Sequence, residues 1–233
     1  MTKLFQHNTL ASLMAGVYEG SLTIDDLLKH GGFGLGTMNM IDGELIILDG
    51  HVYNAKGDKT VTEPDGSAQI PYGAVVNHNP LKETYVNELM QSSDIEKLVQ
   101  SEFPSENVFY SIKMQGTFSK MHVRVIEKST IGTKFVDAAA NQPEFMEENI
   151  SGTVVGIWSP ELFHGVSVAG FHLHFISDDK KFGGHIMDFE ASKISIEIGM
   201  IDELVQNFSV QDQHFMKTDI DVSTILGDIE KSE

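Results

Sequence analysis

The pattern of apolar and polar positions near the start of the chain predicts two short helices followed by a β-meander. The segments Thr9–Tyr18 and Thr23–His30 have the composition of short helices, and each begins at a threonine that can act as an N-cap. Three strand-like segments follow, separated by Asp-Gly hairpin signals. These segments are Phe33–Met40, Glu44–Leu48 and His51–Ala55.

The rest of the chain predicts mainly strands, with a few helices. Helices are expected over Ser93–Glu102, over Lys134–Glu147, where Pro143 should end or kink the helix, and from about Ser223. The expected strands are Ala74–Asn77, Val108–Gln115, His122–Glu127, Ile150–Trp158, Lys193–Gly199 and His214–Asp219. The second and third of these strands should form an antiparallel pair.

This pattern indicates an α/β protein of the α+β kind, with mixed and antiparallel sheets and few helices. We expect two domains. The first is an N-terminal sheet domain with helices over residues 1–145, and the second is a C-terminal β-rich domain over residues 146–233.

Three histidines lie close together in the second of these regions. His172 and His174 alternate with apolar residues, so they point to the same face of a strand. A polar, glycine-ended turn follows, and a hairpin that turns about Asp179–Lys180 places His174 opposite His185. Three converging imidazoles are the ligand set of a catalytic metal site with an open position. The pattern predicts a metal centre, and imidazole suits Zn, Fe, Ni, Co or Cu.

The composition of the chain limits the kinds of molecule it can bind and the chemical groups it can use. The chain has 233 residues, of which 41% are hydrophobic, and a net charge of −18. Nucleic acid is not an expected partner, because phosphate binding needs a basic patch. The absence of cysteine excludes thiolate ligands and a cysteine nucleophile. We expect a cytoplasmic protein, since no secretory signal or bilayer-spanning apolar run is evident.

Several other residues are candidates for the functional site, although each also has an ordinary structural explanation. Arg124 alternates with apolar residues on a predicted strand, where it either clamps a carboxylate in the site or faces solvent. Glu44 begins a strand after a turn, where a charged residue is common. Thr37 lies between glycines that permit close approach, and His164 is a spare ligand candidate. Glu233 ends the chain, where a solvated tail is the ordinary state.

Motifs along nearly the whole chain resemble the α-acetolactate decarboxylase family. They are Gln6-His-Asn-Thr-Leu-Ala-Ser-Leu-Met-Ala-Gly, Gly34-Leu-Gly-Thr, Asp42-Gly-Glu-Leu, Leu48-Asp-Gly, Gly116-Thr-Phe, Met121-His-Val-Arg, Ser159-Pro-Glu-Leu-Phe-His-Gly-Val, Ala169-Gly-Phe-His-Leu-His-Phe, Gly183-Gly-His and Asp188-Phe-Glu. Together these motifs are highly specific to that family.

The resemblance implies a dimeric enzyme that decarboxylates 2-acetolactate to (R)-acetoin and CO₂ through a metal-stabilised enediolate. It implies Zn²⁺ or another divalent transition metal, with no organic cofactor. The metal ligands of the family fall on His172, His174 and His185. Its remaining site residues fall on Arg124, Thr37, Glu44 and Glu233, with Glu230 as the competitor for the last position.

Two other functions are compatible with a three-histidine hairpin. One is a cupin-like metal oxygenase or isomerase, although the glutamate expected shortly after the His-x-His pair is absent. The other is a non-catalytic module that binds a metal or small ligand. Oxygen uptake would favour the first, and metal binding without CO₂ release would favour the second.

Overall fold

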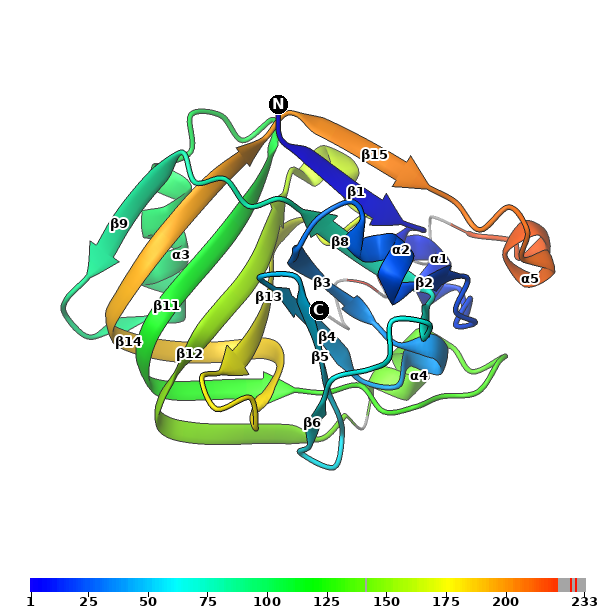
Figure 1. Ribbon diagram of the computed structural model, residues 1–233, viewed down its shortest axis with the longest axis horizontal. Helices are drawn as coiled ribbons and strands as arrows, with labels where there is room; N and C mark the ends of the chain where they lie inside the picture. Colours follow the sequence, from blue (N-terminus) through cyan, green and yellow to red (C-terminus); the bar gives the residue numbers. More distant parts are fainter. Residues whose placement is uncertain (141, 222–226, 228, 230–233) are drawn as a thin grey trace.

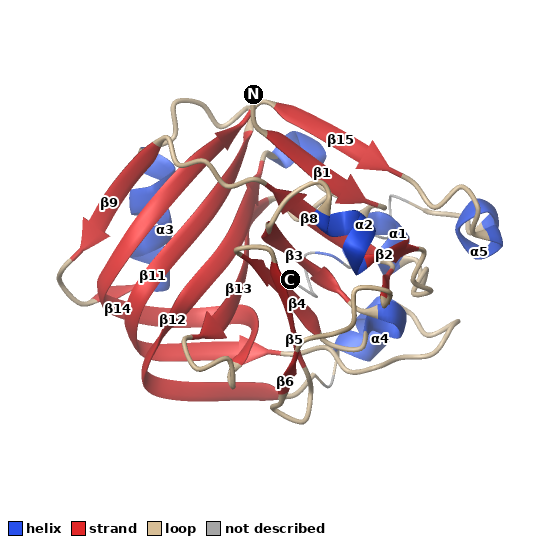
Figure 2. Cartoon of the chain, viewed as in Figure 1, coloured by secondary structure: helices blue, strands red, loops and turns tan. Residues whose placement is uncertain are grey.

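The computed structural model describes residues 1–140, 142–221, 227 and 229, and two large β-sheets dominate these residues (Figures 1 and 2). The first sheet has the strand order β15-β1-β8-β3-β4-β5-β6. Its strands are β1 (Lys3–His7), β3 (Phe33–Thr37), β4 (Glu44–Leu48), β5 (His51–Ala55), β6 (Val61–Thr62), β8 (Tyr72–Val76) and β15 (Glu203–Asn207).

The second sheet has the order β10-β14-β11-β12-β13, with β9 also paired to β14. Its strands are β9 (Lys82–Val86), β10 (Met90–Gln91), β11 (Phe109–Arg124), β12 (Glu144–Ser159), β13 (Gly170–Ser177) and β14 (Gly183–Ile201). Because β13 also pairs with β14, the ladder β13-β12-β11-β14 closes on itself at one end. A small third sheet joins β2 (Leu22–Thr23) to β7 (Gln69–Ile70).

Sequence pattern and structure agree on the β-meander. Strands β3, β4 and β5 are consecutive antiparallel neighbours, and β4 and β5 have the predicted bounds. At the second turn, Asp49 and Gly50 have φ of 53° and 80°, the left-handed backbone that a two-residue hairpin turn requires. The parallel pairing of β1 with β15 was not predicted, because it joins residues about 200 positions apart.

The predicted antiparallel pair Val108–Gln115 and His122–Glu127 is wrong. Most of the first segment and the first three residues of the second belong to the single strand β11, which pairs along its length with β12 and β14. Gly116, with φ of 150°, and the register shifts near Phe118 bend the strand where a turn was expected. The two strands predicted at Ile150–Trp158 and Lys193–Gly199 are likewise parts of the longer β12 and β14.

The helices are short, between five and ten residues each. The two N-terminal helices are confirmed as α1 (Leu10–Met14) and α2 (Ile24–Leu28), and Thr9 and Thr23 accept the capping hydrogen bonds. The third predicted helix is confirmed as α3 (Ser92–Ser101). In the segment predicted as Lys134–Glu147, the helix α4 (Phe135–Ala139) ends early and β12 begins just after Pro143.

Near the C-terminus the predicted strand His214–Asp219 is wrong. This segment contains the helix α5 (Gln213–Lys217), whose N-cap Asp212 accepts a hydrogen bond from the His214 backbone N–H. The helix predicted from Ser223 lies largely outside the described residues. Among the described helices, none has the length and apolar character needed to cross a membrane.

The main core fills the space between the two sheets. Leu35 and Ile46 from the first sheet belong to one buried cluster with Val155 and Ile176 from the second. A second cluster packs α3 against the outer face of the second sheet, and a third packs α2 against the first sheet. The mixed α+β class is therefore confirmed, with mostly antiparallel sheets and few helices.

The division into two domains stays a prediction. The expected boundary after residue 145 falls inside β12, whose ladder partners are β11 before it and β13 after it. The pairing of β1 with β15 also connects the two ends of the chain. The functional site described next takes residues from both sides of this boundary.

Candidate metal centre and active site

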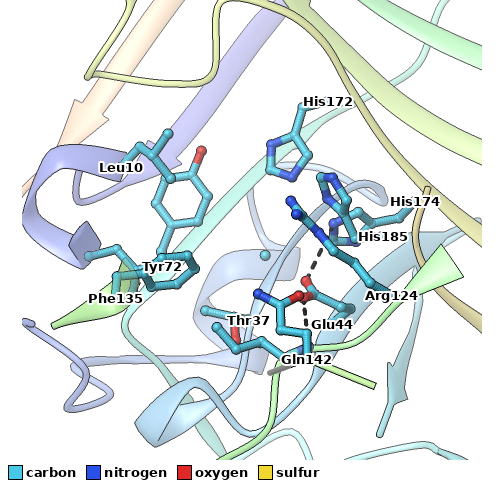
Figure 3. A pocket seen from close by; sticks show the side chains of 13 residues that line it. Leu10, Thr37, Glu44, Tyr72, Arg124, Phe135, Gln142, His172, His174 and His185 are labelled. Atoms are coloured by element: carbon cyan, nitrogen blue, oxygen red, sulfur yellow. Dashed lines mark hydrogen bonds and ion pairs between the residues drawn. The ribbon is translucent and has the colours of Figure 1, made fainter. Parts of the chain in front are cut away.

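The predicted histidine hairpin is present in the structure. β13 and β14 run antiparallel, and His174 is the register partner of His185. His172 lies two residues before His174 on the same face of β13, and the three ring centroids are 5.1–5.4 Å apart (Figure 3). One nitrogen from each ring lies within 4.8 Å of the other two. All three side chains are buried, and this arrangement can hold a metal ion.

The tautomer of His174 suits a metal ligand. Its Nδ1 atom lies 2.8 Å from the carbonyl oxygen of Leu45, which can only accept a hydrogen bond, so Nδ1 carries the proton. The lone pair is then on Nε2. This atom is buried and has no hydrogen-bond partner. A carbonyl that fixes the ring in this way is a common support for a metal-binding histidine.

Burial keeps the three imidazoles neutral. Desolvation lowers the pKa of His174 from 6.5 to about 4, and it lowers the pKa of His172 and His185 well below the same value. The positive charge of Arg124 lowers all three pKa values further. Metal ligation requires the neutral form of histidine, so the cluster has the required protonation state at neutral pH without releasing protons.

Glu44 brings a carboxyl group to the cluster from the other sheet. Its Oε2 atom lies 3.5 Å from Nε2 of His174, and the Ile126 backbone N–H donates to Oε1 over 3.2 Å. Burial raises the pKa of Glu44 to about 7, although the Ile126 hydrogen bond and the charge of Arg124 oppose this change. Near neutral pH this carboxyl group therefore exists in both protonation states.

Arg124 and Thr37 line the same cavity as the histidines and Glu44. Arg124 is the register partner of His185 across β11 and β14, so the site rather than open solvent receives its side chain. Thr37 is the register partner of Glu44, and its hydroxyl donates to the carbonyl oxygen of Gly43 over 2.7 Å. Glu230 and Glu233 lie outside the described residues.

The cavity is small, with about 30 Å³ of space open to the centre of a water-sized molecule. Sequence reasoning missed six side chains that line it, and five of them make an apolar and aromatic wall. These six are Leu10, Leu13, Tyr72, Ile126, Phe135 and Gln142. They come from α1, β8, α4 and the loops after β11 and α4, and no local pattern links these elements to the histidine hairpin. His164 lies outside the three-histidine group, and its Nδ1 accepts from the Ala169 backbone N–H.

Three neutral imidazoles, a carboxyl group with a raised pKa and an arginine around one buried cavity define a candidate metal-dependent enzyme built on two packed sheets. Comparison with known proteins agrees with this class. The family model described as alpha-acetolactate decarboxylase matches residues 4–222, and the chain belongs to this family.

Named relatives align with the whole length of this chain. The alpha-acetolactate decarboxylase of Lactococcus lactis subsp. cremoris (strain MG1363) is 52% identical over 233 residues, which is 100% of this chain and 99% of the relative. That of Bacillus subtilis (strain 168) is 32% identical and covers 100% of this chain, which spans 91% of the relative.

Two solved structures share the fold. A Staphylococcus aureus protein described as similar to alpha-acetolactate decarboxylase is 39% identical, with a TM-score of 0.96 over 99% of this chain and 100% of that one. The alpha-acetolactate decarboxylase of Bacillus subtilis strain 168 is 32% identical, also with a TM-score of 0.96, over 99% of each chain.

Proposed function

We propose that this protein is a carboxy-lyase that converts 2-acetolactate to (R)-acetoin and CO₂. The observation that carries this proposal is the buried group of three neutral histidines with the Glu44 carboxyl group 3.5 Å from His174. Membership of the alpha-acetolactate decarboxylase family supports the same reaction. The substrate is a β-keto acid, and such a reaction needs groups that orient the carboxylate, stabilise charge on the ketone oxygen and deliver a proton.

We propose Zn²⁺ as the resident ion, held by His172, His174 and His185, with no organic cofactor. The unpartnered Nε2 atom of His174 and the neutral state of the rings support this assignment. When bound, a divalent ion supplies Lewis-acid polarisation of the substrate ketone. Other divalent transition metals also accept three imidazole ligands.

Arg124 is proposed to orient the substrate carboxylate through paired hydrogen bonds from its planar guanidinium. The bond between the carboxylate carbon and C2 then breaks. Its electron pair moves through C2 towards the ketone oxygen, CO₂ leaves, and an enediolate remains. Arg124 contributes by orientation, since tight binding of the departing carboxylate would stabilise the ground state. Thr37 helps to shape the wall beside Glu44.

Glu44 is proposed to return the proton to C2 of the enediolate. Its raised pKa of about 7 keeps part of the population protonated at neutral pH, which a general acid requires. Delivery from one side of the cavity would give a single enantiomer. Glu233, with Glu230 as the competitor, remains a proposed second carboxyl group on the basis of the family resemblance.

The test is to mix the purified protein, with its metal content measured, with racemic 2-acetolactate and to follow acetoin by chiral chromatography. We expect (R)-acetoin alone, formed at a rate that falls on chelation and recovers with Zn²⁺. Acetoin at the spontaneous rate from fully metal-loaded protein would overturn the proposal. Oxygen uptake would then point to a metal oxygenase, and stoichiometric metal without turnover would point to a binding module.

We also propose a cytoplasmic homodimer that takes part in acetoin biosynthesis. The family resemblance supports the dimer and the biosynthetic role. Analytical ultracentrifugation of the metal-loaded protein tests the dimer, and a monomer at micromolar concentration would exclude it.

A further inference from the structure

Gln142 places an unsatisfied amide oxygen in the wall of the cavity. The residue follows α4 and precedes Pro143, and its side chain lines the same space as Glu44 and the three histidines (Figure 3). Its Oε1 atom is buried and has no hydrogen-bond partner. A buried acceptor without a partner lowers stability, so a ligand that supplies a donor would bind there favourably.

Two other polar groups around the cavity already have hydrogen-bond partners. The Thr37 hydroxyl donates to the Gly43 carbonyl oxygen, and Oε1 of Glu44 accepts from the Ile126 N–H. The unpartnered nitrogen of His174 belongs to the proposed metal ligand set. Gln142 is therefore the lining amide, among the described residues, that is left to recognise substrate.

We propose that Gln142 determines specificity by accepting a hydrogen bond from the C2 hydroxyl of the substrate. This inference rests on the proposed function. Ionised 2-acetolactate has a carboxylate and a ketone, which only accept hydrogen bonds, and one hydroxyl, which donates. The amide oxygen of Gln142 complements that donor, and the guanidinium of Arg124 complements the carboxylate. A site built to pair a substrate hydroxyl rejects an analogue that lacks it.

The experiment compares two substrates in three proteins. The substrates are 2-acetolactate and 2-methyl-3-oxobutanoate, in which hydrogen replaces the hydroxyl. The proteins are wild type, Gln142→Leu and the control Gln115→Leu, which makes the same change at an exposed position of β11. We expect Gln142→Leu to lower kcat/KM for 2-acetolactate by about 10-fold and to leave that for the analogue within about 2-fold, since one neutral hydrogen bond is lost. The control should change neither.

Equal losses for the two substrates in Gln142→Leu would overturn the proposal, because a merely structural role, or an amide turned to donate to the carboxylate, affects both alike. Wild type without turnover of 2-acetolactate would instead overturn the proposed function. Gln142→Met provides a second apolar variant if Gln142→Leu does not fold. If the analogue reacts too slowly, inhibition constants for 2-hydroxy-2-methylpropanoate and 2-methylpropanoate give the same comparison.

Discussion

The Oε2 atom of Glu44 lies 3.5 Å from the Nε2 atom of His174, although the two residues belong to different sheets. Glu44 begins β4, and His174 lies near the middle of β13. The neighbour of Glu44 along β4, Leu45, accepts the hydrogen bond that fixes the His174 ring. One end of β4 thus supplies both the carboxyl group of the site and the support for a proposed metal ligand.

Replacement of Glu44 by Gln should lower kcat by about 10²–10⁴-fold, because the amide cannot deliver a proton. The three histidines remain, so we expect the metal content to be unchanged. The measurement is turnover of 2-acetolactate at equal metal loading, with Glu63→Gln as the control at an exposed position. Undiminished turnover in metal-loaded Glu44→Gln would remove the proton-donor assignment.

Replacement of His185 by Ala should weaken metal binding by about 100-fold or more, since a direct ligand is lost. Metal content after dialysis, measured by mass spectrometry of the element, should fall from about one ion per chain towards zero. His51→Ala is the matched control, because His51 is exposed on β5 in the other sheet. If His185→Ala kept its ion through dialysis, the ligand set would be wrong.

Replacement of Arg124 by Lys should lower kcat/KM for 2-acetolactate by about 10-fold, because an ammonium group cannot orient the carboxylate through the paired hydrogen bonds of a guanidinium. The positive charge is kept, so the metal content should be unchanged. Steady-state kinetics checks this, with Lys113→Arg as a control exchange on the same strand. An unchanged kcat/KM would argue against a role of Arg124 in positioning the carboxylate.

The stability of the metal-free protein should fall as the pH falls, and Glu44 should partly offset this loss. The three histidines have pKa values lowered from 6.5, so below that pH the unfolded chain binds protons that the folded chain does not. Their contribution lowers the free energy of unfolding as pH falls. The pKa of Glu44 is raised from 4.5 to about 7, so its contribution acts in the opposite direction and lowers stability as pH rises through this range.

Glu44→Gln should therefore steepen the loss of stability between pH 6.5 and pH 4.5 by up to about 1.4 kcal/mol per pH unit, the value for one proton. Urea unfolding of chelated protein measures this slope, and Glu63→Gln should leave it as in wild type. An identical slope in Glu44→Gln would show that the carboxyl group does not titrate as described.

Gly116→Ala should destabilise the fold more than Gly132→Ala. Both glycines have positive φ, of 150° and 90°. A Cβ atom on Gly116 would lie 2.1 Å from the carbonyl oxygen of Lys193, whereas one on Gly132 would meet nothing within 4 Å. We expect a cost of about 1 kcal/mol for Gly132→Ala, from backbone strain alone, and a larger one for Gly116→Ala. Thermal unfolding measures both, and equal costs would exclude the steric contact.

Local signals predicted the parts of the fold that depend on near neighbours. The Asp-Gly turns predicted the bounds of β4 and β5, and the threonine caps predicted the starts of α1 and α2. The polar turn predicted that His174 lies opposite His185. The histidine cluster was predictable because its spacing on one hairpin is enough to bring the ligands together. Glu44 and Arg124 were candidates with ordinary structural alternatives, and the family resemblance assigned them to the site, since no sequence spacing connects β4 or β11 to the hairpin.

The two wrong predictions have different physical causes. Alternation along β11 looked like two strands because bulges interrupt its period, and only the long partners β12 and β14 hold it as one. The segment after Asp212 has the composition of a strand, but it forms a helix that the Asp212 side chain caps. Gln142 and Phe135 enter the cavity through tertiary packing of the segment around α4, which local sequence does not specify.

The closed ladder of β11, β12, β13 and β14 holds all three histidines on one hairpin, whereas Glu44 and Thr37 belong to the other sheet. The proposed metal ligands and the proposed proton donor therefore lie on different sheets. Under these assignments, we expect a change such as Glu44→Gln on β4 to lower turnover while the ion stays bound, whereas loss of a hairpin histidine should remove both metal and turnover.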